Sequence, residues 1–379
     1  MKKLVLIGGG HAHVEVLRQF GLRRLDGVDI TMVSPARHTP YSGMLPGLVA
    51  GHYVFDQCHI DLQPLANYAG ARLVLAHAQV LDAARRVLTL SDGSVHDYDV
   101  ASFNVGSVPI AQDVPGVVEH AIAVKPVADF LAAWDALMDR VRAGAVKSVA
   151  VVGGGAAGVE ILLAMHYRFA QLNPRPELDY CLITDTAQLL PLHARGVRAV
   201  LERNLARKRV TLHRAMRVTR IEACALIAVD ARNDERRIAA DATLWVTGAA
   251  PSAWLANSGL ALNSKEFINI NKYLQSSNHT EVFAAGDCAT VEGVTYPKSG
   301  VYAVRQGPLL AENLRRALSG EMLLDYTPQP RALALISTGE RHAIASWGPL
   351  SIHGNWVWRW KDGIDQAFMA KYRNLPGAC

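Results

Sequence analysis

The chain has 379 residues, of which 50% are hydrophobic and 19% are charged. This composition excludes a disordered or fibrous protein and is sufficient for two or three globular domains. The formal net charge is +5, and no run of Lys or Arg is long enough to indicate a nucleic-acid-binding stripe, so we expect no nucleic-acid partner.

Five cysteines are spread along the chain, and the closest two are 43 residues apart. They are Cys58, Cys181, Cys224, Cys288 and Cys379. This spacing excludes a disulfide framework and a CxxC site, and we expect no bound metal. No stretch reaches the ~18–20 apolar residues of a membrane span, and the short apolar run after Met1 indicates a buried strand rather than a signal peptide. We therefore expect a cytoplasmic protein, with peripheral attachment to the inner face of the membrane as an alternative.

One motif occurs twice. Residues 4–17 (LVLIGGGHAHVEVL) and 149–162 (VAVVGGGAAGVEIL) agree at seven of fourteen positions. Each copy is a short apolar run, then a glycine turn, then a helical pattern, which predicts a buried parallel strand leading through a tight turn into a helix. Such a turn brings a pyrophosphate close to the backbone at a helix N-terminus, so each copy is suited to one dinucleotide.

The second copy keeps three spaced glycines, Gly153, Gly155 and Gly158. The apolar run that follows its helix ends at Asp185, whose carboxylate can accept a hydrogen bond from a ribose 2′-hydroxyl and would repel a 2′-phosphate. We therefore assign NADH to this copy in preference to NADPH.

The first copy departs from the pattern twice. It has Gly8 and Gly10, but His13 occupies the third glycine position, and its next strand ends in Ser34 and Pro35 instead of an acid. His13 is expected to loosen the contact between helix and strand. His11 and His13 lie where their ring N–H groups could meet phosphate oxygens, and the alternative is that both are exposed turn histidines.

With these motifs the chain resembles the pyridine-nucleotide-disulfide oxidoreductases, an α/β superfamily in which an NAD(P)H domain is inserted into an FAD domain. Residues 102–109 and 244–251 are similar to its two crossover segments, and residues 280–289 to its second flavin motif. The resemblance implies two Rossmann-like domains and a small C-terminal α+β element. The predicted division is FAD domain 1–110 and 250–328, NAD(P)H domain 111–249, and C-terminal element 329–379.

The resemblance also implies the cofactor-binding residues, with Asp287 accepting a hydrogen bond from the FAD ribityl chain. On the FAD side they are Gly8, Gly10, His11, His13, Ser34, Pro35, Arg37, Val80, Gly106, Gly286, Asp287, Lys298 and Ser299. On the NAD(P)H side they are Gly153, Gly155, Gly158, Asp185 and Gly248.

Residues 38–53 carry no CxxxxC pair and are similar instead to type II NADH:quinone oxidoreductases and sulfide:quinone oxidoreductases. The second of these enzymes needs a pair of redox cysteines near the flavin, which disfavours sulfide oxidation here. Four segments, 8–17, 39–53, 296–314 and 356–372, resemble more closely the flavoprotein domain fused ahead of selenide, water dikinase. The chain ends soon after the last of them, without the kinase half.

The activity implied is hydride transfer from NAD(P)H to the flavin and on to an acceptor such as a quinone. Lys298 is the candidate that raises the flavin potential, and Glu160 is the candidate that positions NADH, with capping of its helix as the alternative. Two other functions stay open: reduction of a selenium or sulfur compound for selenophosphate synthesis, and a flavin-bearing redox sensor without turnover.

The C-terminal region begins with an alternating stretch within residues 332–347, which predicts a small sheet. Apolar residues then recur every four positions, which predicts a helix with one apolar stripe that Gly363 could interrupt. The stripe consists of Trp356, Trp360, Ile364, Phe368 and Tyr372. It suits a membrane surface, a second copy of the chain, or the body of the protein.

Overall fold

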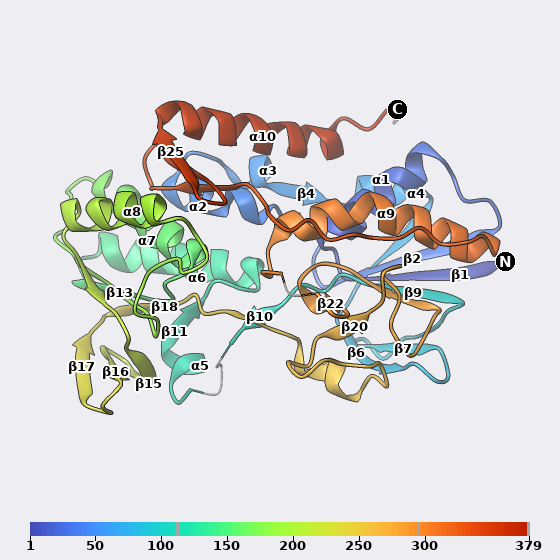
Figure 1. The fold of residues 1–379 in the computed structure, drawn as a ribbon, viewed down its shortest axis with the longest axis horizontal. Helices are drawn as coiled ribbons and strands as arrows, with labels where there is room; N and C mark the ends of the chain where they lie inside the picture. The colour runs from blue at the N-terminus through green and yellow to red at the C-terminus, as the bar shows by residue number, and fades with distance from the viewer. Residues whose placement is uncertain (111–113, 295, 377–379) are drawn as a thin grey trace.

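The computed structural model describes residues 1–110, 114–294 and 296–376 (Figure 1). Cys379 and the predicted start of the NAD(P)H domain at residue 111 lie outside these residues. Two five-stranded parallel sheets occupy the two ends of the molecule, and the C-terminal helix crosses above their junction (Figure 1). The α/β fold with two Rossmann-like cores and a C-terminal α+β element is as predicted.

The first sheet has the strand order β21-β9-β1-β2-β5. Its strands are β1 (Lys2–Ile7), β2 (Val28–Ser34), β5 (Ala71–Leu75), β9 (Val100–Phe103) and β21 (Val282–Ala284). Helices α1 (His11–Leu22), α4 (Leu62–Ala69) and α9 (Gly300–Ser319) lie above it in Figure 1. Leu4, Leu6 and Ile7 of the central strand are fully buried, as is typical of a parallel sheet that is covered on both faces.

The second sheet has the strand order β11-β18-β12-β13-β14 and contains only residues from the middle of the chain. Its strands are β11 (Ala121–Ala123), β12 (Ser148–Val152), β13 (Asp179–Ile183), β14 (Val210–His213) and β18 (Ala242–Trp245). Its helices are α6 (Val127–Arg142), α7 (Ala156–Ala170) and α8 (Arg195–Arg207). In the sequence, four strands of the first sheet precede this segment and the fifth, β21, follows it. The second sheet is therefore an insertion into the first unit.

The two segments that connect the sheets pair with each other. Strand β10 (Val108–Pro109) lies antiparallel to β19 (Ala249–Ala250), with Val108 opposite Ala250. These strands lie in the two segments expected to cross between the domains. A two-stranded ribbon therefore links the two sheets.

Small sheets, one of them parallel and the others antiparallel, and short helices complete the two units. The additional sheets are β3 (His38–Pro40) with β4 (His59–Asp61), β6 (Ala78–Asp82) with β7 (Val87–Leu90) and β8 (Val95–Asp97), β15 (Arg217–Glu222) with β16 (Ala225–Val229) and β17 (Glu235–Ala239), and β20 (Ile268–Ile270) with β22 (Ala289–Val291). The short helices are η1 (Ser42–Met44), α2 (Leu45–Ala50), α3 (Phe55–Cys58), α5 (Val117–His120), η2 (Ala253–Asn257) and η3 (Gly286–Cys288).

The C-terminal element is a three-stranded antiparallel sheet and one long helix. The strands are β23 (Ala334–Ser337), β24 (Ala343–Trp347) and β25 (Leu350–Gly354), and the helix is α10 (Asn355–Arg373). The sequence predicted two of these strands and missed β25. Gly363 does not break α10, so that alternative is wrong: one helical Gly costs only about 1 kcal/mol relative to Ala, and the packing of α10 on the body can offset this.

Helix α10 buries a mixed face and exposes much of the predicted apolar stripe. Trp356, Trp360 and Ile364 are 56%, 41% and 43% exposed. The buried side instead includes Lys361 and Asp365. Near its end, Tyr372 donates a hydrogen bond to the buried carboxylate of Glu15 in α1 (2.9 Å), and the ammonium of Lys371 lies 2.6 Å from the same carboxylate.

Among the described residues, no helix is long and apolar enough to cross a membrane.

Candidate active site

The first glycine turn is shaped by Asn104, which follows strand β9. Gly8 has φ +94°, and a Cβ there would lie 2.5 Å from the backbone oxygen of Asn104. A Cβ on Gly10 would lie 2.2 Å from the side-chain oxygen of the same residue. Both positions therefore require glycine, because the backbone approaches Asn104 closely.

Asn104 also caps helix α1, a role that the sequence did not reveal. Its side-chain oxygen accepts hydrogen bonds from the backbone N–H groups of Ala12 (3.0 Å) and His13 (3.4 Å), while its amide donates to the Ala285 carbonyl (2.7 Å). Two N–H groups of the first turn are thus already bonded within the protein, so fewer remain for a pyrophosphate than the motif alone implied.

His13 does not face a ligand, which corrects both interpretations of this residue. Its ring is fully buried, with Nδ1 2.7 Å from the Gly8 carbonyl and Nε2 2.8 Å from the Ser102 hydroxyl. Burial lowers the pKa of His13 to about 4, so the ring is neutral at neutral pH. His13 joins helix and strand by hydrogen bonds instead of loosening their contact.

His11, by contrast, keeps a free ring atom at the N-terminus of α1. Its Nε2 is buried and has no hydrogen-bond partner among the described residues. The ring lies edge-on to Tyr41 and Phe368, with centroids 5.5 and 6.0 Å away. Burial lowers its pKa, and the Asp287 carboxylate partly offsets this. A buried polar atom without a partner at a helix N-terminus fits a bound phosphate or flavin group.

The other residues predicted on the FAD side lie near the ends of the first sheet. The Ser34 hydroxyl donates to the Ala36 carbonyl (2.8 Å), and the Arg37 guanidinium forms two bonds to Asp61 (2.9 and 2.6 Å). Val80 is 55% exposed on β6. At Gly106 (φ +74°) an added Cβ would meet nothing within 4 Å, so this turn borders open space. Their contacts with a cofactor stay predictions.

The second glycine turn has the close approaches expected of the motif. A Cβ on Gly153 (φ +132°) would lie 2.0 Å from the Val246 carbonyl, and one on Gly158 would lie 2.0 Å from the Gly153 carbonyl. At Gly155 nothing lies within 4 Å. No side chain caps α7 in the part of the chain that the structure describes, so its first N–H groups stay available to an anion.

Two further residues predicted on this side follow the ends of strands in the second sheet. Asp185 is exposed two residues beyond β13, which is parallel to β12. This position suits contact with a ribose, and the contact itself stays a prediction. Gly248 precedes the ribbon between the sheets, where a Cβ would lie 2.8 Å from the side chain of Ile110.

Asp287 lies in a turn held by buried polar side chains. Gly286 has φ +74°, and its N–H donates to the side-chain oxygen of Gln306 (2.7 Å). The Asp287 carboxylate is 14% exposed and lies 3.0 Å from the ammonium of Lys125. Neither Gln306 nor Lys125 was singled out from the sequence, because both contacts join residues far apart in the chain.

Lys298 is largely enclosed by protein oxygens and an aromatic ring. Its ammonium donates to the carbonyl of Ala289 and to the hydroxyl of Thr290 (2.9 Å), and it lies 4.1 Å from the ring centre of Phe267. Burial lowers the pKa of Lys298 to about 8. Ser299 precedes helix α9 directly. A flavin contact through Lys298 therefore stays a prediction.

Glu160 connects helix α7 to the C-terminal element. Its carboxylate accepts a hydrogen bond from the backbone N–H of Ser337 (2.7 Å), so the alternative that it caps its own helix is wrong. Burial raises the pKa of Glu160 to about 7, an effect that nearby Lys361 opposes. The carboxyl group can thus take up or release a proton near neutral pH.

Helix α10 covers residues 38–53, the segment that is similar to the quinone oxidoreductases. The Lys361 ammonium lies 2.6 Å from the Asp365 carboxylate and donates to the Gly43 carbonyl (2.6 Å). The rings of Tyr41 and Phe368 stack with centroids 4.2 Å apart. Three parts of the chain therefore meet at one place: segment 38–53, α10 and the first turn of α1.

The described thiols offer neither a redox pair nor a reactive group near this place. Burial raises the pKa of Cys288 to about 11 and that of Cys58 to about 12, so both are protonated at neutral pH. Within the described ranges no group of His, Cys, Asp and Glu could hold a metal ion.

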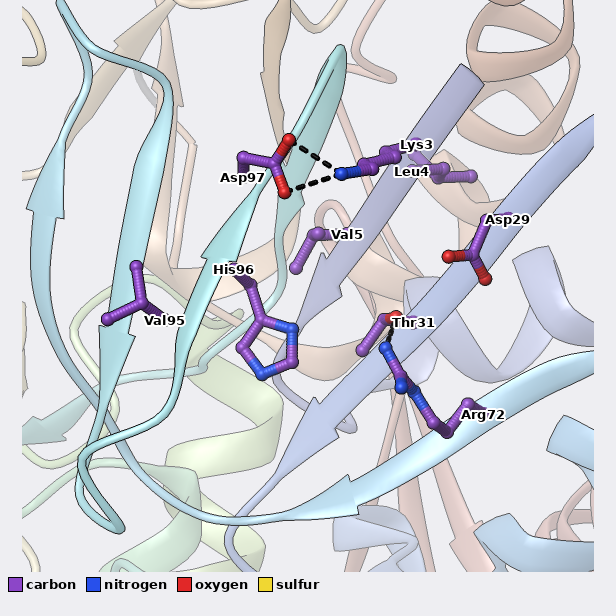
Figure 2. A pocket seen from close by; sticks show the side chains of 9 residues that line it. All are labelled: Lys3, Leu4, Val5, Asp29, Thr31, Arg72, Val95, His96 and Asp97. Atoms are coloured by element: carbon purple, nitrogen blue, oxygen red, sulfur yellow. Dashed lines mark hydrogen bonds and ion pairs between the residues drawn. The ribbon is translucent and has the colours of Figure 1, made fainter. Parts of the chain in front are cut away.

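A separate cavity of about 250 Å³ lies at the opposite end of the first sheet (Figure 2). It is lined by Lys3 near the start of β1 and by Asp29 near the start of β2, and Lys3 is bonded to Asp97 (2.7 Å). Ligands of open α/β sheets bind beyond the carboxyl ends of the strands, so this cavity is not the cofactor site.

Comparisons with known proteins agree with this geometry. The sequence profile of pyridine nucleotide-disulphide oxidoreductases matches residues 2–307. A type II NADH:quinone oxidoreductase of Staphylococcus epidermidis is 23% identical over 346 residues, covering 86% of this chain and 85% of that protein. A demethylphylloquinone reductase of Synechocystis is 27% identical, covering 62% of this chain and 58% of that protein.

Solved structures share the fold. The sulfide:quinone oxidoreductase of Aquifex aeolicus superposes with a TM-score of 0.82 at 18% identity, covering 99% of this chain and 92% of that one. NDH2 of Plasmodium falciparum, solved with NADH, gives a TM-score of 0.79 at 14% identity, covering 99% of both chains. Together with the two glycine turns on separate parallel sheets, these matches establish that the chain belongs to the pyridine nucleotide-disulphide oxidoreductase family.

Proposed function

We propose that this chain is an FAD-dependent NAD(P)H:quinone oxidoreductase. The observation that carries the proposal is the pair of glycine turns, each at the carboxyl end of the central strand of its own sheet, with the sheets joined by the β10–β19 ribbon. A protein built this way can hold two dinucleotides with their reactive rings in contact. The domain division 1–110 with 250–328, 111–249 and 329–379 is part of this proposal.

FAD, when bound, supplies the chemistry that accepts a hydride and passes electrons to the acceptor. The residues of the first unit fit it: the free Nε2 of His11, the open backbone at Gly106 and the carboxylate of Asp287. The residues of the second unit fit NADH: the uncapped first turn of α7 and the exposed carboxylate of Asp185. The protein's task is to align the two and to exclude water.

Reduction of a quinone also consumes two protons, and Glu160 is the group that we propose to hold one of them. Burial raises the pKa of its carboxyl group to about 7, and the backbone N–H of Ser337 in β23 bonds to it. A group that titrates near the working pH is the most effective general acid. The buried Lys361–Asp365 pair beside it can compensate the change in charge.

A quinone as acceptor is supported by the names of the relatives and by the exposed apolar residues of the C-terminal element. Trp356, Trp360 and Ile364 on α10 project outward, and so do Trp347 and Leu350 at the β24–β25 turn. An exposed apolar surface suits the boundary of a lipid bilayer, where quinones dissolve. We propose peripheral membrane contact through this surface. A homodimer through the same residues is the other expectation from the sequence.

Anaerobic mixing with NADH tests the proposal. The flavin absorption near 450 nm should disappear within seconds, and added quinone should restore it. Reoxidation by a selenium oxyanion but not by a quinone would favour the selenium alternative, and a flavin that stays oxidised under excess NADH and NADPH would favour the non-catalytic partner. A purified chain that neither contains nor takes up FAD would overturn the proposal.

A further inference from the structure

Lys125 lies between the two units and contacts a predicted flavin ligand. It immediately precedes Pro126, the N-cap residue of α6 in the second unit. Its ammonium is 3.0 Å from the Asp287 carboxylate in the first unit and 3.0 Å from the hydroxyl of Ser107, which itself donates to that carboxylate (3.2 Å). Three polar groups from three separate segments thus meet at one point.

Both contacts to Asp287 use the same carboxylate oxygen. Lys125 and Ser107 both bond to Oδ2 of Asp287, while Oδ1 accepts no hydrogen bond from the residues that the structure describes. The carboxylate is only 14% exposed, so few water molecules reach it. An ionised carboxylate has sites for about four hydrogen bonds, which leaves Oδ1 free for a ligand hydroxyl.

The backbone beneath Asp287 is held as firmly as its side chain. Gln306 accepts the N–H of Gly286, and the Asn104 amide donates to the Ala285 carbonyl. The backbone at Asp287 is therefore fixed. The remaining freedom of this residue is rotation of its carboxylate group. The ammonium of Lys125 and the hydroxyl of Ser107 fix that rotation.

We propose that Lys125 is a positioning residue for the flavin: it holds Oδ2 of Asp287 so that Oδ1 accepts a hydrogen bond from a ribityl hydroxyl of FAD. This inference rests on the proposed function, since it takes FAD as the ligand of Asp287. Lys125 comes from the inserted unit, so tight flavin binding depends on that unit being docked against the first.

The dissociation constant for FAD tests this role of Lys125 directly. Lys125→Met should weaken FAD binding about 10- to 100-fold, the range set by one charge-assisted hydrogen bond. Lys125→Arg keeps a cation within reach of Oδ2 and should restore most of the affinity. At saturating FAD, the KM for NADH of Lys125→Met should stay within about twofold of wild type, because the second glycine turn is untouched.

A double-mutant cycle shows whether Lys125 acts through Asp287. Asp287→Asn should weaken FAD binding by itself, and adding Lys125→Met should then have little further effect. Lys272→Met, which removes the lysine of an exposed pair with Asp325, is the matched control and should leave FAD affinity unchanged. The melting temperatures of the apoproteins show whether each variant is folded.

Wild-type FAD affinity in a folded Lys125→Met protein would overturn the inference, and so would additive effects in the cycle. A different result would refute the proposed function. A wild-type protein that binds FAD tightly but is not reduced by NADH would refute the oxidoreductase activity and leave the role of Lys125 standing.

Discussion

The Nδ1 atom of His13 lies 2.7 Å from the carbonyl oxygen of Gly8. In the second copy of the motif the equivalent residues are Gly158 and Gly153, where the helix approaches the strand so closely that a Cβ would lie 2.0 Å from the carbonyl. The two copies thus meet the same geometric requirement in different ways: one omits the side chain, and the other bonds it to the carbonyl.

His13→Ala should destabilise the folded protein by about 2–4 kcal/mol, because it leaves a cavity and removes the partners of two buried groups, the Gly8 carbonyl and the Ser102 hydroxyl. Urea unfolding measures this change. His13→Gly, which restores the glycine pattern, should be no more stable than His13→Ala. A fully stable glycine variant would show that the hydrogen bonds do not matter.

The same ring predicts a pH dependence of stability. Burial lowers the pKa of His13 to about 4, whereas the unfolded chain titrates near 6.5, so protons bind preferentially to the unfolded state between these values. Stability should therefore fall as the pH drops from 7 to 5, by about 2 kcal/mol from this residue. His13→Gln should lack this part of the loss. Equal losses in both proteins would contradict the assignment.

Glu160→Gln should separate the two halves of the reaction. Flavin reduction by NADH should change little, while the turnover number with a quinone should fall about 100-fold, because the variant cannot release a proton. The wild-type pH profile should show an inflection near 7 that the variant lacks, in line with the raised pKa of Glu160. Stopped-flow and steady-state assays on the same preparations provide both rates.

Lys298→Met should lower the two-electron potential of the flavin by about 30–60 mV if its ammonium stabilises the reduced cofactor. Since burial lowers the pKa of Lys298 to about 8, the difference between variant and wild type should shrink as the pH rises above 8. Spectroelectrochemical titration at pH 7 and 9 checks both effects. Equal potentials at pH 7 would remove Lys298 from the flavin site.

Asp185→Ser should change the nucleotide preference. Removal of an exposed carboxylate beside the predicted ribose site should raise kcat/KM with NADPH relative to NADH roughly tenfold. An unchanged ratio would show that this carboxylate does not contact the ribose.

Replacing Trp356, Trp360 and Ile364 together by Ser should reduce liposome binding at least about tenfold, because the three exposed side chains supply most of the apolar area of α10. Leu192→Ser, at a residue that is 80% exposed elsewhere, is the control. A gel-filtration measurement distinguishes the other expectation: a dimer that the triple variant converts to a monomer would favour self-association.

The sequence predicted the features that arise from local patterns. The duplicated motif predicted both parallel sheets, and the four-residue spacing of apolar residues from Trp356 to Tyr372 predicted the C-terminal helix. The residues that complete the site were missed because their roles depend on contacts across the chain. Asn104 accepts a hydrogen bond from the backbone N–H of His13, which is 91 positions away in the sequence. Lys125 donates to the carboxylate of Asp287, which is 162 positions away.

The apolar stripe of α10 shows a second kind of error. Trp356 and Trp360 were grouped with Tyr372, yet the first two are exposed and the third is 4% exposed. A spacing of four residues drifts around a helix by about 40° per step, so a stripe of five members passes from one side to another. Lys361 and Asp365 take the buried side instead, and pairing with each other allows their burial.

Glu15 gives the C-terminal helix a mechanical connection to the first unit. Because Tyr372 and Lys371 both bond to its carboxylate, α10 is anchored to α1, and His11 begins that same helix. A force on the outer side of α10, from a lipid surface or from another molecule, therefore reaches the turn where the flavin is proposed to bind. Substituting Glu15 would remove this connection and leave α10 held to the first unit by the Lys361–Gly43 bond and the Tyr41–Phe368 stack.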